Sequence, residues 1–325
     1  MTVKTQHLPA ETQAIAAAAR IIRGGGLVAF PTETVYGLGA DATSGRAVAG
    51  IYTAKGRPRF NPLIAHVTDL DAARVQGVFS ADAEKLALSF WPGPLTLVVP
   101  KAATCTVSDI ATAGLDSVAL RVPVHAVALA LLAAVGRPVA APSANVSGHV
   151  SATTAAHVAA DLDGRIDAII DGGATDVGLE STIIACLDGA VTMLRPGGVS
   201  REAIEAVLGH TLGEAIPANG DEPIAPGMLA SHYAPKARVR LNADVVLAGE
   251  AWLGFGDLQP LGLAQAVVSA NLSATGDLTE AAANLFGLLR SLDRSDVVSI
   301  AVATIPAEGL GEAIQDRLGR ASAER

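Results

Sequence analysis

Short runs of apolar residues alternate with amphipathic segments along the first 210 residues of the chain. Apolar runs bounded by glycine or proline predict strands, and apolar residues spaced three or four apart predict helices. We therefore expect helices at residues 11–23, 46–55, 81–90, 127–135 and 154–162, and strands at residues 27–30, 63–67, 95–99, 118–122, 138–141 and 168–170. Asp188-Gly189, between apolar runs at residues 182–187 and 190–194, predicts a two-residue hairpin. Such alternation predicts a mixed α/β sheet.

The regular pattern breaks down between Thr211 and Pro235. The residues that interrupt it are Pro217, Gly220, Pro223, Pro226 and Gly227. Beyond this stretch we expect strands at residues 239–241, 245–247, 252–255 and 298–302 and helices at residues 278–292 and 311–318. The chain is therefore predicted to have a first domain at residues 1–210, a linker at residues 211–235 and a smaller α/β domain at residues 236–325.

Composition indicates an acidic protein with enough apolar residues for two domains. The 325 residues are 50% hydrophobic, and the formal net charge of −9 argues against binding nucleic acid or anionic membranes by bulk electrostatics. The N-terminus has no apolar signal core, and no segment approaches about 18 uninterrupted apolar residues, so we expect a cytoplasmic protein. Cys105 and Cys186 lack CxxC spacing and are predicted to be small core residues.

One window of this acidic chain is purely basic. Residues 42–68 contain no Asp or Glu, and they include Arg46, Lys55, Arg57 and Arg59. The window follows a loop at residues 32–34 that is expected at the end of the strand at residues 27–30. These neighbouring segments predict a local anion-binding patch.

Motifs that would indicate several other chemistries are absent from the sequence. It contains no GxxxxGK[ST], no GxGxxG after a strand, and no HExxH, CxxC or GxSxG. Polar residues instead gather at the ends of predicted strands: Thr32, Thr34, residues 55–61, His66, Ser117, Arg121, residues 143–148, Ser151, residues 180–182 and residues 195–198. Cations, hydroxyls and small residues in such a set suit a phosphate-bearing ligand.

Each of these residues, taken alone, also has a structural explanation. Lys55 and Arg57 fit solvated charges at a helix C-terminus, which favours cations. His66, on an apolar strand, fits a structural histidine. Arg121 lies in an apolar strand and needs a partner anion, so a structural ion pair and a functional role are both open. Residues 142–145 fit a turn, and Ser181 and Arg195 fit local contacts.

Longer segments, taken in order, are far more specific. They are PTETVYGL at residues 31–38, KGRP at 55–58, NPL at 61–63, WPGPLT at 91–96, RVP at 121–123, APSANVSG at 141–148, EST at 180–182, RPG at 195–197, APGM at 225–228 and SHYAP at 231–235. In this order they resemble the threonylcarbamoyl-AMP synthase family, the YrdC-like enzymes, in the longer form with an additional C-terminal domain. The resemblance covers essentially the whole chain. It implies a YrdC-like twisted mixed α/β sheet with flanking helices, plus a smaller Rossmann-like α/β domain.

The resemblance implies a nucleotidyltransferase that forms threonylcarbamoyl-AMP and pyrophosphate from L-threonine, bicarbonate and ATP. A threonine carbamate would attack the α-phosphate in line, so positioning and cations would dominate catalysis. Mg2+ would be bound mainly through the oxygens of ATP, with no metal ligand expected from the protein. The product would go to a downstream tRNA threonylcarbamoyl-transfer complex acting on tRNAs that read codons beginning with A, and direct contact with tRNA stays open.

The family's pattern also assigns roles to residues of this chain. L-threonine is expected at Thr34, His66, Arg121, the backbone of Ala141, and Ser181. ATP is expected at Arg57, Asn61, Ser117, Ser143, Asn145, Ser151, Arg195 and Tyr233. Lys55 and Arg57 are expected to be the catalytic cations that meet the phosphates, so replacing either with Ala should abolish product formation and leave folding intact. Arg121 is expected to grip a carboxylate, and hydroxyl partners to help select threonine over valine.

The linker acquires a role through the same resemblance. In this family the interdomain segment reaches over the active site, so residues 228–235 are expected to form a lid. His232 and Tyr233 would shield the reactive intermediate from water. A common form of the linker has more basic residues before this tyrosine, whereas Leu229, Ala230 and Ser231 stand here, so little electrostatic help is expected from the lid.

Three other functions remain open on the sequence alone. The family domain has a concave surface proposed to bind double-stranded RNA, but aromatic residues are only 3% of this chain and both predicted domains are net acidic. A related carbamoyl-adenylate enzyme of hydrogenase maturation usually carries acylphosphatase-like and zinc-finger portions, which this sequence does not show. A regulatory paralogue without catalysis would be expected to lose part of the set Lys55, Arg57, Ser143 and Asn145, which is retained here.

Overall fold

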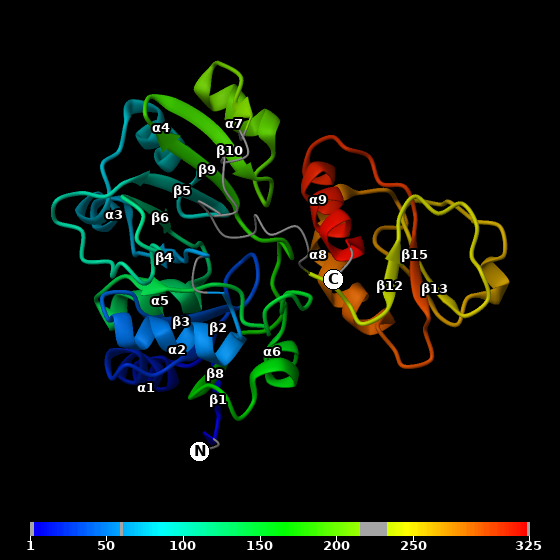
Figure 1. The fold of residues 1–325 in the computed structure, drawn as a ribbon, viewed down its shortest axis with the longest axis horizontal. Helices are drawn as coiled ribbons and strands as arrows, with labels where there is room; N and C mark the ends of the chain where they lie inside the picture. Colours follow the sequence, from blue (N-terminus) through cyan, green and yellow to red (C-terminus); the bar gives the residue numbers. More distant parts are fainter. Residues whose placement is uncertain (1–2, 59–60, 215–232, 324–325) are drawn as a thin grey trace.

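A computed structural model of the chain describes residues 3–58, 61–214 and 233–323. The first body is built on an 11-stranded mixed sheet in the order β1-β8-β2-β3-β7-β4-β6-β5-β9-β10-β11 (Figure 1). Its strands are β1 (Gln6–Pro9), β2 (Val28–Phe30), β3 (Gly37–Asp41), β4 (Ile64–His66), β5 (Leu95–Pro100), β6 (Ser117–Arg121), β7 (Val139–Ala140), β8 (Ala168–Asp171), β9 (Thr182–Leu187), β10 (Ala190–Arg195) and β11 (Gly213–Glu214). Its helices are α1 (Thr12–Arg23), α2 (Gly45–Lys55), α3 (Leu70–Gln76), α4 (Ala81–Phe90), α5 (Ala126–Val135), α6 (Ala155–Leu162) and α7 (Arg201–Leu208).

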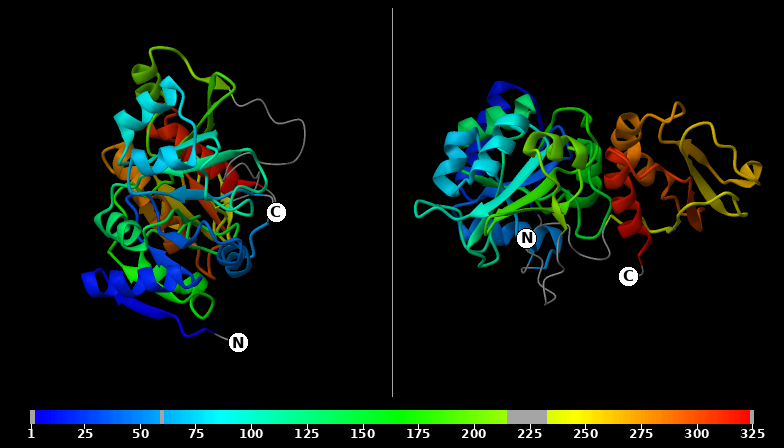
Figure 2. Two further views of the ribbon diagram at one scale, coloured as in Figure 1. Left: turned by 90° about the vertical axis from the view of Figure 1, so that its left-hand side faces the viewer. Right: turned by 90° about the horizontal axis from the view of Figure 1, so that it is seen from above.

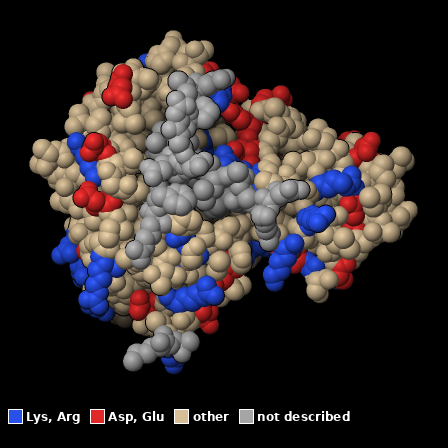
Figure 3. Space-filling model, viewed as in Figure 1, with Lys and Arg blue, Asp and Glu red and all other residues tan. Residues whose placement is uncertain are grey.

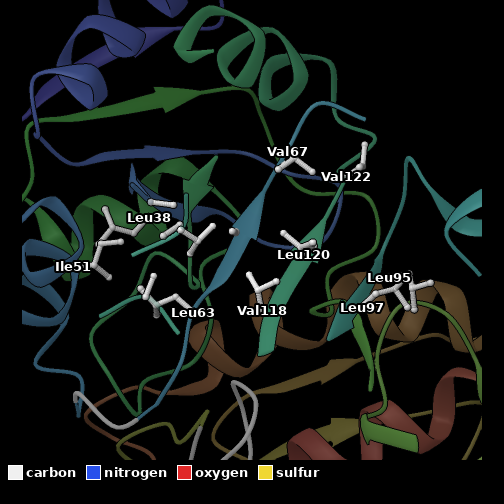
Figure 4. Packing of buried hydrophobic residues seen from close by; sticks show 14 of the residues in the cluster. Leu38, Ile51, Leu63, Val67, Leu95, Leu97, Val118, Leu120 and Val122 are labelled. Atoms are coloured by element: carbon white, nitrogen blue, oxygen red, sulfur yellow. The ribbon is translucent and has the colours of Figure 1, made fainter. Parts of the chain in front are cut away.

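Helices pack against most of this sheet, and one small part of its core is formed by strands alone among the described elements. Helices α1 and α5 pack with β2, β7 and β8 in one core cluster, and α2, α4, α6 and α7 contribute to the larger cluster, part of which is shown in Figure 4. Residues alternate along β5, so Leu97 joins the larger cluster whereas Val98 joins a small one with Ile64 and Leu194. No described helix contributes to that small cluster. The residues of the small cluster are nonetheless buried, and one of them, Ile64, lines the candidate site.

The second body has an all-parallel sheet in the order β12-β15-β13-β14. Its elements are β12 (Arg238–Arg240), β13 (Glu250–Gly254), the short 3-10 helix η1 (Leu263–Gln265), β14 (Ser269–Asn271), α8 (Leu278–Leu292), β15 (Ser299–Val302) and α9 (Leu310–Ser322). Figures 1 and 2 show α8 and α9 between this sheet and the first body. The contact is close: Gly178 has φ 71°, and a Cβ there would lie 2.5 Å from the Ala282 carbonyl oxygen. A glycine is therefore required where the first body meets α8.

The observed elements confirm the expected α/β class and most of the expected helices and strands. Asp188 and Gly189, with φ of 51° and 76°, form the predicted hairpin turn. Cys186 is buried in the core cluster, and Cys105 is partly buried and packs against that cluster. The strand expected at residues 245–247 is wrong, because Val245 makes only one isolated bridge, to Leu261. β11 pairs with β10 and so extends the first sheet past the expected boundary at residue 210. No helix in the described ranges is long and apolar enough to cross a membrane.

Candidate active site

The candidate site lies where two parallel strands end. β4 ends at His66 and β6 at Arg121, and these residues are register partners, so both side chains lie at the same edge of the sheet. The cavity beside them is lined by Thr34, Val35, Arg57, Ile64, His66, Arg121, Ala141, Pro142, Ser143, Glu180, Ser181, Arg195 and Tyr233. Every residue expected for threonine is in this lining. Of those expected for ATP, the structure brings Arg57, Ser143, Arg195 and Tyr233 to it.

Arg121 both forms a buried ion pair and faces the cavity. Its Nη2 donates to Glu33 Oε1 at 2.6 Å, and its Nε donates to the Gly93 carbonyl at 3.4 Å. The other Glu33 oxygen accepts from the amide of Val124 at 3.2 Å. No described residue accepts from Arg121 Nη1, which leaves this nitrogen for a ligand. Glu33 received no role from the sequence, although the need of a strand arginine for an anion pointed to such a neighbour.

Lys55 is buried behind the cavity wall rather than solvated. It ends α2, is 1% exposed, and its Nζ donates to the carbonyls of Ser143 and Asn145, both at 2.5 Å. Burial, followed by the nearby Arg57, lowers the pKa of Lys55 well below its ordinary value. Lys55 thus holds the segment that carries Ser143. The premise that Lys55 is not part of the core is wrong, because its side chain lies in the packed interior, and we therefore expect its removal to affect folding.

Arg57 and Arg195 carry the cavity's other guanidinium groups, and neither is a solvated charge. Arg57 is 8% exposed and donates to the carbonyls of Asn61 and Pro62. Arg195 is 4% exposed and donates from Nη2 to the Ser181 carbonyl at 2.9 Å. Burial lowers the pKa of Arg57 to about 10, so it remains a cation at neutral pH.

A glycine lets the Arg195 loop turn back onto the strand that carries Ser181. A Cβ at Gly197 would lie 2.4 Å from the Glu180 carbonyl oxygen and 2.5 Å from the Thr182 amide nitrogen. Only a residue without a side chain permits this approach. The RPG segment at residues 195–197 is therefore explained by backbone packing as well as by its arginine.

Four residues expected at ATP do not line the cavity. Asn61 is fully buried, and neither its Oδ1 nor its Nδ2 has a hydrogen-bond partner in the described part of the chain. Asn145 donates to the carbonyls of Val146 and His149, and Ser151 donates to Glu180 Oε1 at 2.5 Å. Ser117 begins β6, at the opposite end of that strand from Arg121. Asn61 thus has unmet hydrogen-bonding capacity, whereas Ser117 is not brought to the site.

A second-body residue, Arg317, also reaches the site and was missed by the sequence. Arg317 of α9 is fully buried and donates from Nε to Glu180 Oε2 at 2.9 Å. Its guanidinium carbon lies over the Tyr233 ring, 5.2 Å from the ring centroid. Tyr233 adopts φ 61° and also stacks on Phe286 of α8. Burial raises the pKa of Glu180, but Arg317, Arg195 and Ser151 outweigh it and hold this pKa below its ordinary value. Nothing in the pattern of α9 distinguished Arg317 from an exposed helix cation. Residues 228–232 of the expected lid lie outside the described residues.

His66 is expected to make the protein acid-sensitive. Burial, then the neighbouring Arg121, lowers its pKa to about 3, so the imidazole in the folded protein is neutral. The unfolded chain takes up a proton below about pH 6.5, and stability must therefore fall as the pH drops below that value. Between pH 6.5 and 5.0, the free energy of unfolding should fall by roughly 1.5 kcal/mol more in the wild type than in His66→Gln. Urea unfolding of both proteins at both pH values measures this difference. An equal fall in the free energy of unfolding in the wild type and in His66→Gln would contradict the prediction.

Comparisons with known proteins agree over both bodies. A sequence profile of the family described as "Telomere recombination" matches residues 20–197, and one described as "Threonylcarbamoyl-AMP synthase, C-terminal domain" matches residues 199–323. The threonylcarbamoyl-AMP synthase of Bacillus subtilis is 42% identical, with 99% of this chain and 96% of that protein covered. That of Pyrococcus abyssi is 43% identical, with 95% and 94% covered.

A solved structure is similar over the same extent. The crystal structure of P. abyssi Sua5 complexed with L-threonine matches with a TM-score of 0.88 and 41% identity, covering 98% of this chain and 97% of that one. The likeness therefore includes the two-body arrangement and not only the larger sheet.

Proposed function

This chain belongs to the threonylcarbamoyl-AMP synthase family, and we propose that it joins L-threonine, bicarbonate and ATP into threonylcarbamoyl-AMP and pyrophosphate. The observation that carries the proposal is a pair of buried guanidinium groups without carboxylate partners. Every hydrogen bond that Arg57 and Arg195 make to described residues goes to a carbonyl or hydroxyl oxygen. Buried positive charge of this kind is costly without an anion, and a triphosphate supplies one.

The threonine half of the site is supported by Arg121 and its neighbours. A relative of similar sequence was crystallised with L-threonine. In this chain, Arg121 keeps one nitrogen free of described partners next to the neutral His66 and the hydroxyls of Thr34 and Ser181. A guanidinium suits the carboxylate of an amino acid, and the hydroxyls suit its polar side chain and nitrogen.

The proposed reaction needs no nucleophile from the protein. Threonine nitrogen and bicarbonate give a carbamate and water, and a carbamate oxygen then forms a bond to the α-phosphorus while the bond to pyrophosphate breaks. The chain's part is to place the carbamate in line and to stabilise charge on the leaving pyrophosphate. We assign this role to Arg57 and Arg195, which line the cavity, and an indirect role to Lys55, whose Nζ contacts the Ser143 carbonyl.

We infer that Mg2+ arrives with ATP rather than on protein ligands. The described residues contain no group of three or more His, Cys, Asp or Glu side chains that could hold a metal ion. The two carboxylates next to the cavity, Glu33 and Glu180, are each paired with an arginine. When bound, Mg2+ would offset triphosphate charge through the nucleotide's own oxygens. The product would pass in the cytoplasm to the complex that transfers threonylcarbamoyl groups to tRNA.

The deciding experiment is a product assay. The purified protein is incubated with labelled threonine, bicarbonate and MgATP, and pyrophosphate release is measured while mass spectrometry looks for the adenylate. We expect a product that requires both threonine and bicarbonate. Folded protein that yields no threonine-dependent product would refute the proposal.

RNA binding without catalysis is the competing function. On the face shown in Figure 3, outside the region drawn in grey, basic and acidic side chains are interspersed, without a continuous basic stripe. A filter-binding titration of tRNA against salt tests this alternative. Tight, salt-sensitive tRNA binding by a protein that makes no adenylate would favour it.

A further inference from the structure

Two hydroxyl pairs connect the cavity wall to side chains behind it. Thr34 and Ser181 line the cavity, whereas Thr32 and Thr96 do not. The oxygens of Thr32 and Thr34 lie 2.8 Å apart and those of Thr96 and Ser181 2.7 Å apart, and none of the four residues is more than 2% exposed. A hydroxyl has one proton and two lone pairs, so the direction of each bond decides what the cavity-facing partner offers to a ligand.

The first pair has only one direction that satisfies its neighbours. Thr32 Oγ1 donates its single proton to the Val35 carbonyl at 2.7 Å, and no other described group donates to that carbonyl. Thr32 therefore accepts from Thr34 with one lone pair in their shared bond, while the longer contacts from the amides of Thr34 and Val35, at 3.2 and 3.3 Å, share the other lone pair. The proton of Thr34 is then committed, and its oxygen presents only lone pairs to the cavity.

The second pair leads to the opposite polarity. Thr96 is fully buried on β5, and Ser181 is the only described residue whose side chain or backbone bonds its hydroxyl. Thr96 must donate to Ser181, because otherwise its buried proton would have no partner. Arg195 Nη2 also points to Ser181 Oγ, at 3.4 Å, and brings a second donor. With both lone pairs of Ser181 facing donors, its own proton is left for the cavity.

We propose that Thr32 and Thr96 are positioning residues that fix these polarities, so that Thr34 is an obligate acceptor and Ser181 an obligate donor toward the amino-acid substrate. This rests on the proposed function in taking that substrate to be L-threonine. Thr34 then pairs with a substrate N–H or O–H, and Ser181 with a substrate oxygen. A side chain that lacks these groups leaves buried hydroxyls unpaired, which is how a site rejects an isosteric analogue.

The test measures L-threonine binding by calorimetry to the full-length protein. Thr96→Val keeps the shape of the side chain and removes its donor, and it should weaken threonine binding about tenfold while leaving ATP affinity unchanged. Thr96→Ser restores the hydroxyl and should bring the dissociation constant back to within about twofold of the wild type. Thr96→Val with unchanged threonine affinity would overturn the proposal.

A double-mutant cycle separates positioning from general packing. If Thr96 acts through Ser181, Thr96→Val should cost less than about twofold in a Ser181→Ala background. An equal loss of threonine affinity in both backgrounds would mean that Thr96 only supports the strand, and this would overturn its proposed role. The same cycle is run for the first pair: the effect of Thr32→Val on threonine affinity is measured in the wild type and in a Thr34→Val background. Thr32→Ser is the control, because it retains the hydroxyl that contacts the loop amides.

The outcomes also separate this inference from the proposed function. A wild-type protein that binds threonine with the expected couplings but forms no adenylate would refute the synthase activity and leave the hydroxyl polarity standing. A protein that makes the adenylate but shows no coupling in these cycles would support the synthase activity and overturn the proposed hydroxyl polarity. A wild-type protein that binds no threonine would overturn the inference about its hydroxyls.

Discussion

Replacing Arg57 with Met should lower kcat/KM for ATP by about 10²- to 10³-fold and leave threonine binding intact. Arg57 lines the cavity as a cation, and it bonds to the carbonyls of Asn61 and Pro62 but to no described carboxylate. Its charge is therefore available to the phosphates of the proposed substrate ATP, above all as negative charge grows on the departing pyrophosphate. Threonine-dependent pyrophosphate release measures the loss, and calorimetry with threonine checks the rest of the site.

Arg74 is a matched control for this substitution. It lies on the surface and pairs with Asp71 and Glu84. Arg74→Met removes a guanidinium of the same kind from a solvated ion pair, and such pairs contribute little to stability. We expect wild-type kinetics from it. If Arg57→Met keeps a third or more of the wild-type kcat/KM, Arg57 does not meet the phosphates.

Lys55→Met should lower adenylate formation about 10²-fold and also remove a pH-dependent part of the stability. The Lys55 ammonium bonds the carbonyls of Ser143 and Asn145, and Ser143 lines the cavity. Without these donors the segment loses its anchor, so we expect both the proposed ATP site and the local fold to be affected. Loss of activity together with altered unfolding distinguishes this role from a simple phosphate contact.

The sign of the pH effect follows from the lowered pKa of Lys55. The unfolded chain holds the lysine proton up to about pH 10.4, whereas the folded protein releases it at a lower pH. Within that window stability rises with pH, by up to about 1.4 kcal/mol per unit. Urea unfolding of the wild type at pH 7 and pH 9 should therefore show a gain relative to Lys55→Met.

Lys85→Met is the control for this second substitution. Lys85 is a helix lysine of α4 whose Nζ donates to one carbonyl, that of Leu208, at 3.1 Å. It does not line the cavity, so its removal should leave the activity unchanged. Parallel pH profiles for Lys55→Met and the wild type would show that Lys55 titrates as in the unfolded chain.

Elements with strong local signals were predictable from the sequence. The helix expected at residues 278–292 is α8 to the residue, because its apolar spacing is regular and Asp277 caps its first turn. β3 had no such signal, since two of its five residues are glycines. A Cβ at Gly39 would lie 2.8 Å from Phe30, so this glycine serves close packing in the sheet rather than a turn. The need for glycine at this position cannot be predicted without knowing that Phe30 lies on the neighbouring strand.

The failed strand at residues 245–247 has a similar cause. An apolar run predicts a strand only if a partner lies beside it. In the parallel sheet, β15 occupies the place between β12 and β13, and the run at residues 245–247 is left with a single bridge from Val245 to Leu261. Strand order, which follows from long-range crossovers, therefore decided between strand and loop.

The sequence by itself determined the α/β class, the two-body organisation, the family and a set of residues that line one cavity. These follow from local periodicity and from motifs whose order along the chain is specific. Only the tertiary structure decided what each charge does: Lys55 holds carbonyls 88 and 90 positions away, and Arg317 meets Glu180 across 137 positions. Burial and partnership depend on which strands become neighbours, and for buried charges and hydroxyls these long-range contacts set both pKa and hydrogen-bond direction.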